Sequence, residues 1–270
     1  MRTEVSLPSW LDSLIFDELG ANYCRSNADM TVIDWDKTQI LNYLGTYFPR
    51  SFAESVCIFS EFLPSSCSSF LEKEHLDVLD FGCGTGGEII GLLLVLNSRL
   101  PNLKSVTVKA IDGNIHAIKL LRKVIDALSS RLRYSIELEE SPITIDDFYD
   151  MSILDVILSK QYDIVMSFKA VCEFVTKQQF EDHNAYEQIS RVLLPKLAHT
   201  GIMLLVDVAS YSNVSQDWLP NMMDRGLLAN GCRIIAKNPG NNMSFYVSHS
   251  RHTRDLTKIA WRLIQGQTNC

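Results

Sequence analysis

The chain has 270 residues, of which 46% are apolar and 21% are charged. This composition is that of an ordinary packed globular protein, and no repeat or low-complexity segment interrupts it. The formal net charge of −7 argues against binding to nucleic acid through bulk electrostatics, although it leaves room for a local basic patch.

Neither a secretory signal nor a membrane span is visible. The first ten residues, MRTEVSLPSW, lack a charged region followed by an apolar one. The longest apolar run, Ile89 to Leu96, has eight residues, whereas a span needs about 20. The seven cysteines are odd in number and never spaced as CxxC, so neither a disulfide framework nor a zinc site is indicated. We therefore expect a cytoplasmic protein without a bound metal.

Residues 1–75 are expected to form a helical N-terminal segment that covers a substrate site. Apolar residues at helical spacing mark a first helix from Trp10 to Leu19 and a second that begins at Ile40. A third helix is predicted from Phe52 to Phe62 and is expected to end near a proline and a serine-rich loop.

From residue 76 onward, short apolar strands alternate with amphipathic helices. Such alternation implies crossover connections and a mainly parallel sheet with helices on both faces. The predicted strands lie at 76–81, 105–112, 134–139, 162–168, 201–208, 232–237 and 243–249. The last two are predicted to form a hairpin, and Arg251 to Ile264 an amphipathic helix. We thus expect an α/β domain over residues 76–270, with seven mostly parallel strands and an antiparallel strand at its C-terminal end.

An acid and a glycine cluster follow the first of these strands. Residues Asp80 to Gly87 read DFGCGTGG and lead into an apolar helix. Glycines let the backbone turn tightly and approach a ligand closely, and the start of a helix offers free N–H groups to an anion. In open α/β sheets, ligands bind beyond the carboxyl ends of the strands, so we expect a ligand site here.

Gly82, Gly84 and Gly87 also satisfy the GxGxxG pattern of dinucleotide-binding proteins. Asp80 disfavours that interpretation, because a carboxylate at the mouth of the site would repel a pyrophosphate but accept hydrogen bonds from an ammonium group. S-adenosylmethionine (SAM) carries both an ammonium and a carboxylate, so an acid beside free N–H groups suits it.

The segment DFGCGTGG resembles motif I of class I SAM-dependent methyltransferases. The similarity extends over roughly residues 76–250 and includes Ile189 to Val206, which is similar to the family's LLxPGG region and fifth strand, with Gly201 later than usual. The resemblance implies a Rossmann-like fold, SAM as the methyl donor and S-adenosylhomocysteine (SAH) as the product. A shorter stretch, Tyr43 to Phe52, is similar to ribosomal small-subunit methyltransferases, but this chain lacks the cysteine cluster common in those proteins.

The resemblance also implies a set of cofactor-binding residues. Asp112 ends the second strand, where the family places an acid that accepts from the ribose hydroxyls; capping of the next helix is the alternative. Asp147 with Phe148 is the candidate for the adenine. Other acids considered for the adenine are Glu140, Asp146 and Asp150. The expected cofactor-binding residues are Asp80, Phe81, Gly82, Cys83, Gly84, Gly86, Asp112, Gly113, Asn114, Asp147, Phe148, Ser167, Phe168 and Lys169.

Fewer signals point to the methyl acceptor. The strand end at Ser167 to Lys169 lacks the Asp/Asn-Pro-Pro-aromatic motif that some nucleic-acid and amide methyltransferases carry there. The polar and aromatic run at 209–218 is where an acceptor pocket would form. The candidate acceptor residues are Glu173, Asp207, Tyr211 and Tyr47. The sequence does not identify a candidate general base.

The sequence therefore favours a SAM-dependent methyltransferase that acts on a small molecule or a peptide. Three alternatives remain open: an RNA methyltransferase, a SAM-fold scaffold subunit with little catalysis, and an NAD(P)-dependent oxidoreductase. Methyl transfer from SAM is an in-line displacement at an already activated carbon, so the protein chiefly needs to align the acceptor in a dry site.

Overall fold

The protein is seen in a computed structural model that describes residues 1–24, 36–66, 68–174, 184–212 and 216–266. The chain forms two compact units that alternate along the sequence. Unit 1 comprises residues 1–75, 83–144 and 244–257, and unit 2 comprises residues 76–82, 145–243 and 258–270. The division into residues 1–75 and 76–270 stays a prediction.

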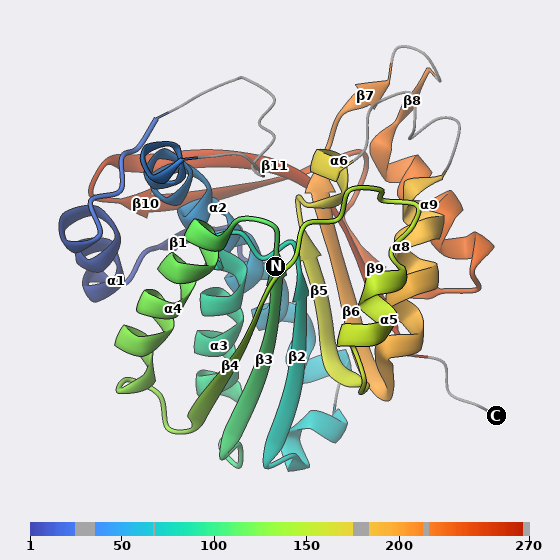
Figure 1. The fold of residues 1–270 in the computed structure, drawn as a ribbon, viewed down its shortest axis with the longest axis horizontal. Coiled ribbons are helices and arrows are strands. Elements are labelled where there is room, and N and C mark those ends of the chain that lie inside the picture. Colours follow the sequence, from blue (N-terminus) through green and yellow to red (C-terminus); the bar gives the residue numbers. More distant parts are fainter. Residues whose placement is uncertain (25–35, 67, 175–183, 213–215, 267–270) are drawn as a thin grey trace. The chain divides into compact units, whose positions relative to one another are not determined.

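Unit 1 combines helices with two pairs of parallel strands. β1 (Glu4–Ser6) pairs with β10 (Met243–His249), and β3 (Ser105–Asp112) pairs with β4 (Ser135–Pro142). Helix α4 lies along β3 and β4, and α2 lies against both α3 and α4 (Figure 1). The helices of this unit are α1 (Ser9–Ser13), the π-helix η1 (Leu14–Glu18), α2 (Lys37–Ser66), η2 (Ser68–Glu72), α3 (Gly87–Arg99) and α4 (Ile115–Ser129).

Unit 2 contains the other strands. β2 (His75–Phe81), β5 (Tyr162–Phe168) and β6 (Leu197–Val208) run parallel to one another. β11 (His252–Gln265) is antiparallel both to β6 and to β9 (Arg233–Lys237). The remaining elements are α5 (Ser152–Ile157), α6 (Val171–Phe174), α8 (Ala185–Leu193), η3 (Leu194–Lys196), β7 (Tyr211–Ser212), β8 (Asp217–Trp218) and α9 (Leu219–Ala229). Helices α8 and α9 lie side by side (Figure 1).

The predicted fold class is confirmed: the fold is α/β, its sheet is mostly parallel, and an antiparallel strand lies at the C-terminal end. In the described part of the chain the main sheet has nine strands, against the seven expected. The strand predicted at 162–168 has the same bounds in the structure, where all seven of its residues are buried. A continuous apolar run of this kind is typical of a central parallel strand.

The helix predicted from Arg251 to Ile264 is wrong, because this segment forms β11. Asp255, Thr257 and Ile259 are buried at alternate positions, as in a strand with one covered face. Residues 259–264 are all buried, and β6 and β9 flank this part of the strand. An apolar run that is buried on both faces cannot be assigned to helix or strand from its periodicity.

The hairpin predicted between 232–237 and 243–249 is also wrong. β9 pairs with β11, and β10 pairs with β1. The side chain of Asn238 explains the path of the chain after β9. Its Oδ1 accepts hydrogen bonds from the Trp261 N–H and the Arg262 guanidinium, both at 2.9 Å. These hydrogen bonds hold the turn after β9 against β11. The turn residues had instead predicted a hairpin onto the next strand.

The two helices predicted around Ile40 and Phe52 are a single helix, α2, of 30 residues. Pro49 lies in its interior, although a proline there removes a hydrogen bond and costs about 3 kcal/mol. Burial offsets this cost, since Leu44, Phe48 and Phe52 are all buried and each contributes about 1.5–3 kcal/mol. Despite the length of α2, the described residues include no helix that is both long and apolar enough to cross a membrane.

Helix α2 lies against α3 with almost no space between the two backbones. A Cβ on Gly87 would lie 2.3 Å from the Phe48 carbonyl oxygen, and Gly91 makes a similar close contact one turn later. The Ser55 hydroxyl donates to the Glu88 carbonyl at 2.7 Å. The absence of a side chain at these glycines permits the approach, so the first turn of α3 is held directly against α2.

Candidate active site

The glycine loop of unit 1 folds onto the end of β3. The Cys83 N–H donates to the Ile111 carbonyl at 3.0 Å, and the Gly86 N–H donates to the Cys83 carbonyl at 2.8 Å. Gly84 and Gly86 have φ angles of 48° and 78°, a left-handed conformation that favours glycine. Glycine is therefore favoured at these two positions because the backbone adopts positive φ angles there.

Asp112, at the carboxyl end of β3, lies beside this loop. Its Oδ2 accepts from the Gly84 N–H and its Oδ1 accepts from the Asn114 N–H, each at 2.7 Å. Burial raises the pKa of Asp112 above its ordinary value, while the two backbone hydrogen bonds act in the opposite direction. A carboxylate offers about four acceptor positions, so this half-buried group can still accept from a pair of hydroxyl groups.

Helix α4 is capped by Asn114 and not by Asp112. The Asn114 Oδ1 accepts from the His116 N–H at 2.9 Å and from the Ala117 N–H at 3.1 Å. The capping role considered for Asp112 therefore belongs to Asn114, which leaves Asp112 available for a ligand. Gly113 has ordinary room around it, because the nearest atom to an added Cβ would be 3.6 Å away. Cofactor contacts by Gly113 and Asn114 stay predictions.

In unit 2, two predicted site residues place buried polar groups on neighbouring parallel strands. Asp80 of β2 is fully buried and lies opposite Met166 of β5. Ser167 follows on β5; it is 1% exposed, and its Oγ has no hydrogen-bond partner among the described residues. A buried polar group without a hydrogen-bond partner costs about 1–3 kcal/mol. A ligand that supplies such a partner would therefore bind more tightly. Phe81 and Phe168 beside them are buried and apolar.

Strand β5 ends in a residue with an unusual backbone. Lys169 is buried and has a φ of 57°, a conformation that costs a residue with a Cβ about 1–2 kcal/mol. Its N–H donates to the Val206 carbonyl at 2.7 Å. Strained backbone conformations cluster at functional sites, and the strain at Lys169 is consistent with its predicted place in the site.

Asp207, at the end of β6, holds the segment that follows β5. Its Oδ2 accepts from the Cys172 N–H at 3.1 Å and from the Tyr186 hydroxyl at 2.8 Å, and its Oδ1 accepts from the Val208 N–H at 2.8 Å. Burial raises the pKa of Asp207, whereas hydrogen bonds from these three residues act to lower it. These contacts give Asp207 a positioning role; its contact with the acceptor stays a prediction.

The acids considered for the adenine make local contacts. The Asp147 Oδ1 accepts from the Tyr149 N–H at 2.9 Å and so closes a turn. Glu140 forms an ion pair with Arg122 at 2.7 Å. Phe148 is buried while the preceding Asp147 is exposed. Such a pair suits adenine, whose ring could pack against Phe148 and whose amino group could donate to Asp147. Asp147 with Phe148 therefore remains the predicted pair.

The predicted acceptor residues are divided between the units. In unit 2, Tyr211 is 38% exposed and packs edge to face against Trp218, and Glu173 is half-buried in α6. In unit 1, Tyr47 stacks on Tyr43 of the same helix, with ring centroids 4.9 Å apart. Their roles toward an acceptor stay predictions.

Tyr43 lies at the glycine loop, although no sequence motif marks it as a site residue. A Cβ on Gly84 would lie 3.0 Å from the Tyr43 hydroxyl oxygen. One signal was present in the sequence, because tyrosines at positions 43 and 47 share a helix face at i, i+4 spacing. The contact of that face with a loop far along the chain is a tertiary contact, which local patterns do not reveal.

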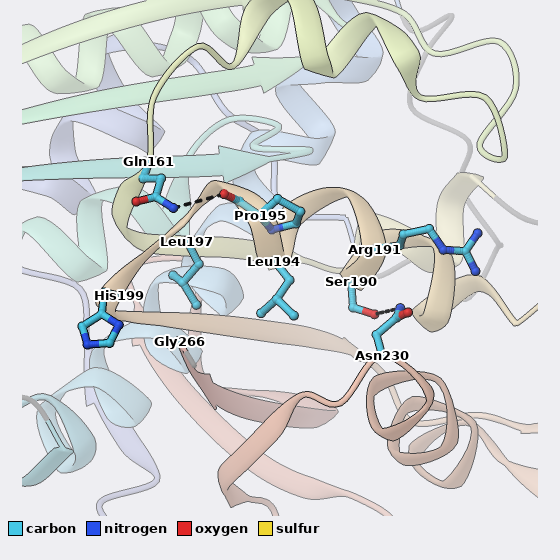
Figure 2. A pocket seen from close by; sticks show the side chains of 9 residues that line it. All are labelled: Gln161, Ser190, Arg191, Leu194, Pro195, Leu197, His199, Asn230 and Gly266. Atoms are coloured by element: carbon cyan, nitrogen blue, oxygen red, sulfur yellow. Dashed lines mark hydrogen bonds between the residues drawn. The ribbon is translucent and has the colours of Figure 1, made fainter. Parts of the chain in front are cut away.

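A cavity of about 640 Å³ in unit 2 lies at the opposite ends of the strands (Figure 2). Gln161 precedes β5 and Leu197 begins β6, so the cavity opens at the amino-terminal ends of both strands. The Gln161 amide donates to the Pro195 carbonyl at 3.4 Å, and the Asn230 amide donates to the Ser190 hydroxyl at 2.8 Å. Ligands of parallel α/β sheets bind at the carboxyl ends, so this cavity is distinct from the candidate active site.

No protein-family model matches the sequence, and no curated protein does either. Similar solved structures include a SAM-dependent methyltransferase from Aquifex aeolicus, at 13% identity and a TM-score of 0.49, covering 87% of this chain and 100% of that chain. Precorrin-6y C5,15-methyltransferase from Geobacter metallireducens has 13% identity and a TM-score of 0.45, covering 79% of this chain and 88% of that chain. TrmN from Thermus thermophilus has 15% identity and a TM-score of 0.45, covering 83% of this chain and 53% of that chain.

The fold of the chain is mostly parallel α/β, and its segment from Asp80 to Gly87 resembles motif I of class I SAM-dependent methyltransferases. Class I methyltransferases are enzymes that take their methyl group from SAM.

Proposed function

We propose that the chain is a SAM-dependent methyltransferase whose cofactor contacts the glycine loop. The observation that carries the proposal is the 2.7 Å hydrogen bond from the Gly84 N–H to the Asp112 carboxylate. It places an acid suited to a ribose diol directly at a loop of left-handed glycines. The loop continues into α3, and the N-terminus of a helix favours an anionic group.

The polar groups of the described residues fit SAM. The ammonium group of SAM is the kind of group that the Asp80 carboxylate is expected to bind. The carboxylate of SAM suits the N–H groups at the start of α3. NAD fits less well, because its pyrophosphate would lie at a loop that Asp80 directly precedes.

SAM, when bound, supplies a methyl group that is already activated for transfer. The residues of the chain therefore need to orient the two reactants and exclude water. Orientation alone accounts for a large part of the rate enhancement in such reactions. The buried side chains of Phe81 and Phe168 make the ends of β2 and β5 apolar, which favours a dry site.

For the acceptor, we propose a small molecule or a peptide. The net charge of −7 weakens the attraction to a polyanion, and the strand end at 167–169 lacks the Asp/Asn-Pro-Pro-aromatic motif. The scattered, odd-numbered cysteines support a cytoplasmic location as part of the same proposal.

Transfer of a labelled methyl group tests this proposal. The purified chain is incubated with SAM labelled in the methyl group and with an extract divided into small-molecule, peptide and RNA fractions. We expect label to appear in the small-molecule or the peptide fraction. A labelled small molecule would pass an ultrafiltration membrane, and a labelled peptide would be degraded by protease. Label that is sensitive to nuclease would instead identify an RNA acceptor. Tight SAM binding without transfer to any fraction would indicate a partner-binding subunit and contradict the proposed activity.

A further inference from the structure

The first residues of unit 1 lie against β10 and β11, which are neighbours in the main sheet. β1 runs parallel to β10, and the Leu7 N–H extends this pairing with a hydrogen bond to the Ser248 carbonyl at 2.9 Å. The Tyr23 hydroxyl donates to the Asp255 carboxylate of β11 at 3.0 Å. Residues 4–23 therefore form an N-terminal arm that is attached to both strands.

His249, the last residue of β10, is buried between this arm and β11. It is 8% exposed, and its ring stacks on Phe16 of η1 with centroids 5.0 Å apart and an interplanar angle of 16°. The rings of Tyr23 and His252 lie 5.2 Å and 6.4 Å from it, measured between centroids. The imidazole is thus surrounded by rings from the arm on one side and from β11 on the other.

The two ring nitrogens of His249 are buried, and neither has a hydrogen-bond partner among the described residues. Buried polar atoms are nearly always paired, so an exception needs an explanation. Stacking on Phe16 does not require an imidazole, because a phenylalanine ring would stack in the same place without buried polar atoms. What an imidazole adds is a charge that appears when the pH falls below about 6.5.

Charged groups from three elements face the His249 ring. Burial has the largest effect and lowers the pKa of His249 below its ordinary value. Asp255 of β11 and Asp12 of α1 act to raise this pKa, whereas His252 of β11 and Arg50 of α2 act to lower it. The neutral imidazole is therefore the form that suits the closed arm.

The two nearby carboxylates already accept hydrogen bonds from other groups. Asp255 is 1% exposed and accepts from the Arg50 Nε at 2.7 Å and from the Tyr23 hydroxyl at 3.0 Å. The Asp12 Oδ1 accepts from the Ser250 N–H at 2.9 Å. Neither carboxylate is hydrogen-bonded to the imidazole, so a proton on the ring would place an unpaired charge in a buried site, which is costly.

We propose that His249 is an acid-sensitive switch: its neutral ring keeps the N-terminal arm closed on β10 and β11, and its protonation releases the arm. The released state exposes the ring to water and so binds the proton more readily than the closed state. The contribution of His249 to closure is therefore fully present above about pH 6.5, the ordinary pKa of histidine. It is lost as the pH falls through the lower pKa of the closed state. The inference concerns the arm alone and does not depend on methyl transfer.

Hydrogen–deuterium exchange of the full chain at pH 7.5 and pH 5.5 tests the switch, with rates corrected for the intrinsic effect of pH on exchange. We expect the opening equilibrium of peptides from residues 4–23 to rise several-fold at pH 5.5. Uptake of one proton by a group whose pKa is about 6.5 when exposed limits this rise to about tenfold. Peptides from β3, in the same unit, should change less than twofold.

His249→Phe keeps a stacking ring and cannot be protonated, so we expect its arm to stay closed, with less than a twofold change between the two pH values. His249→Leu is a second apolar variant with the same expected result. The matched control is His252→Phe, which removes the neighbouring imidazole and should retain the pH dependence of the wild type.

Three results would overturn the inference. The first is a wild-type arm whose opening does not change between pH 7.5 and pH 5.5. The second is a pH dependence in His249→Phe and His249→Leu that equals that of the wild type. The third is an arm that is already open at pH 7.5 in both variants, because the neutral ring would then act through contacts that an apolar side chain cannot make.

Discussion

Gly84→Asp is expected to abolish the binding of SAM and SAH, with a rise in Kd of at least about 100-fold, while the chain stays folded. Position 84 has a φ of 48°, and a side chain there meets the Tyr43 hydroxyl at 3.0 Å. The new side chain would occupy cofactor space at the loop. It would also bring a second carboxylate next to that of the ligand, and like charges at close range repel each other strongly. Calorimetry with SAH measures the loss, and urea denaturation confirms the fold.

Two further variants separate the causes of that loss. Gly84→Asn adds a side chain of the same size without the charge, so we expect weak binding that is measurably better than in Gly84→Asp. Gly240→Asp is the control for the backbone, because Gly240 has a φ of 58° and nothing within 4 Å of an added Cβ. Aspartate tolerates this conformation better than most residues, and SAH binding should stay within twofold. Undiminished binding by Gly84→Asp would contradict the location of the site.

Asp112→Asn is expected to weaken SAH binding by about 100-fold. An asparagine side chain presents one acceptor oxygen in place of two, so it cannot serve both backbone N–H groups and a ribose diol. Two charge-assisted hydrogen bonds at about 1.5 kcal/mol each amount to about 3 kcal/mol, which corresponds to about 100-fold in Kd. Calorimetry of wild type and variant under the same conditions measures the difference.

A ligand variant distinguishes a ribose contact from support of the loop. The 2′-deoxy analogue of SAH lacks one hydroxyl that Asp112 is proposed to bind. In the wild type, we expect the analogue to bind more weakly than SAH. In Asp112→Asn, this difference in affinity should largely disappear, because the free-energy changes from removing two groups that contact each other do not add. If Asp112 only supports the Gly84 peptide, the variant would weaken both ligands by the same factor, and the ribose role would be lost.

The parts of the fold that follow local patterns could be predicted from the sequence. The strand at 162–168 and the glycine loop are examples, because a buried apolar run and a cluster of glycines each have a local cause. β11 could not be predicted, since its apolar residues fit a helix until β6 and β9 are seen on either side. Its neighbours are set by tertiary pairing, which periodicity does not encode.

The candidate site shows the same division. The Asp112 carboxylate lies 2.7 Å from the Gly84 N–H, at the carboxyl end of β3, where ligands of parallel sheets bind. The placement of Tyr43 depends on the close approach of α2 to α3 at Gly87, which has no local signature. The bonds from Cys172 and Tyr186 to Asp207 were likewise beyond prediction, because they join segments that are distant in the sequence.

The central claim is that the glycine loop recognises an adenosyl amino acid. Titration calorimetry of the wild-type chain with SAM, SAH and NAD tests it most directly. We expect SAM and SAH to bind with a Kd in the micromolar range, corresponding to about −8 kcal/mol, and NAD to bind at least about 100-fold more weakly. Preferential binding of NAD, or no heat with either adenosyl ligand, would contradict the account.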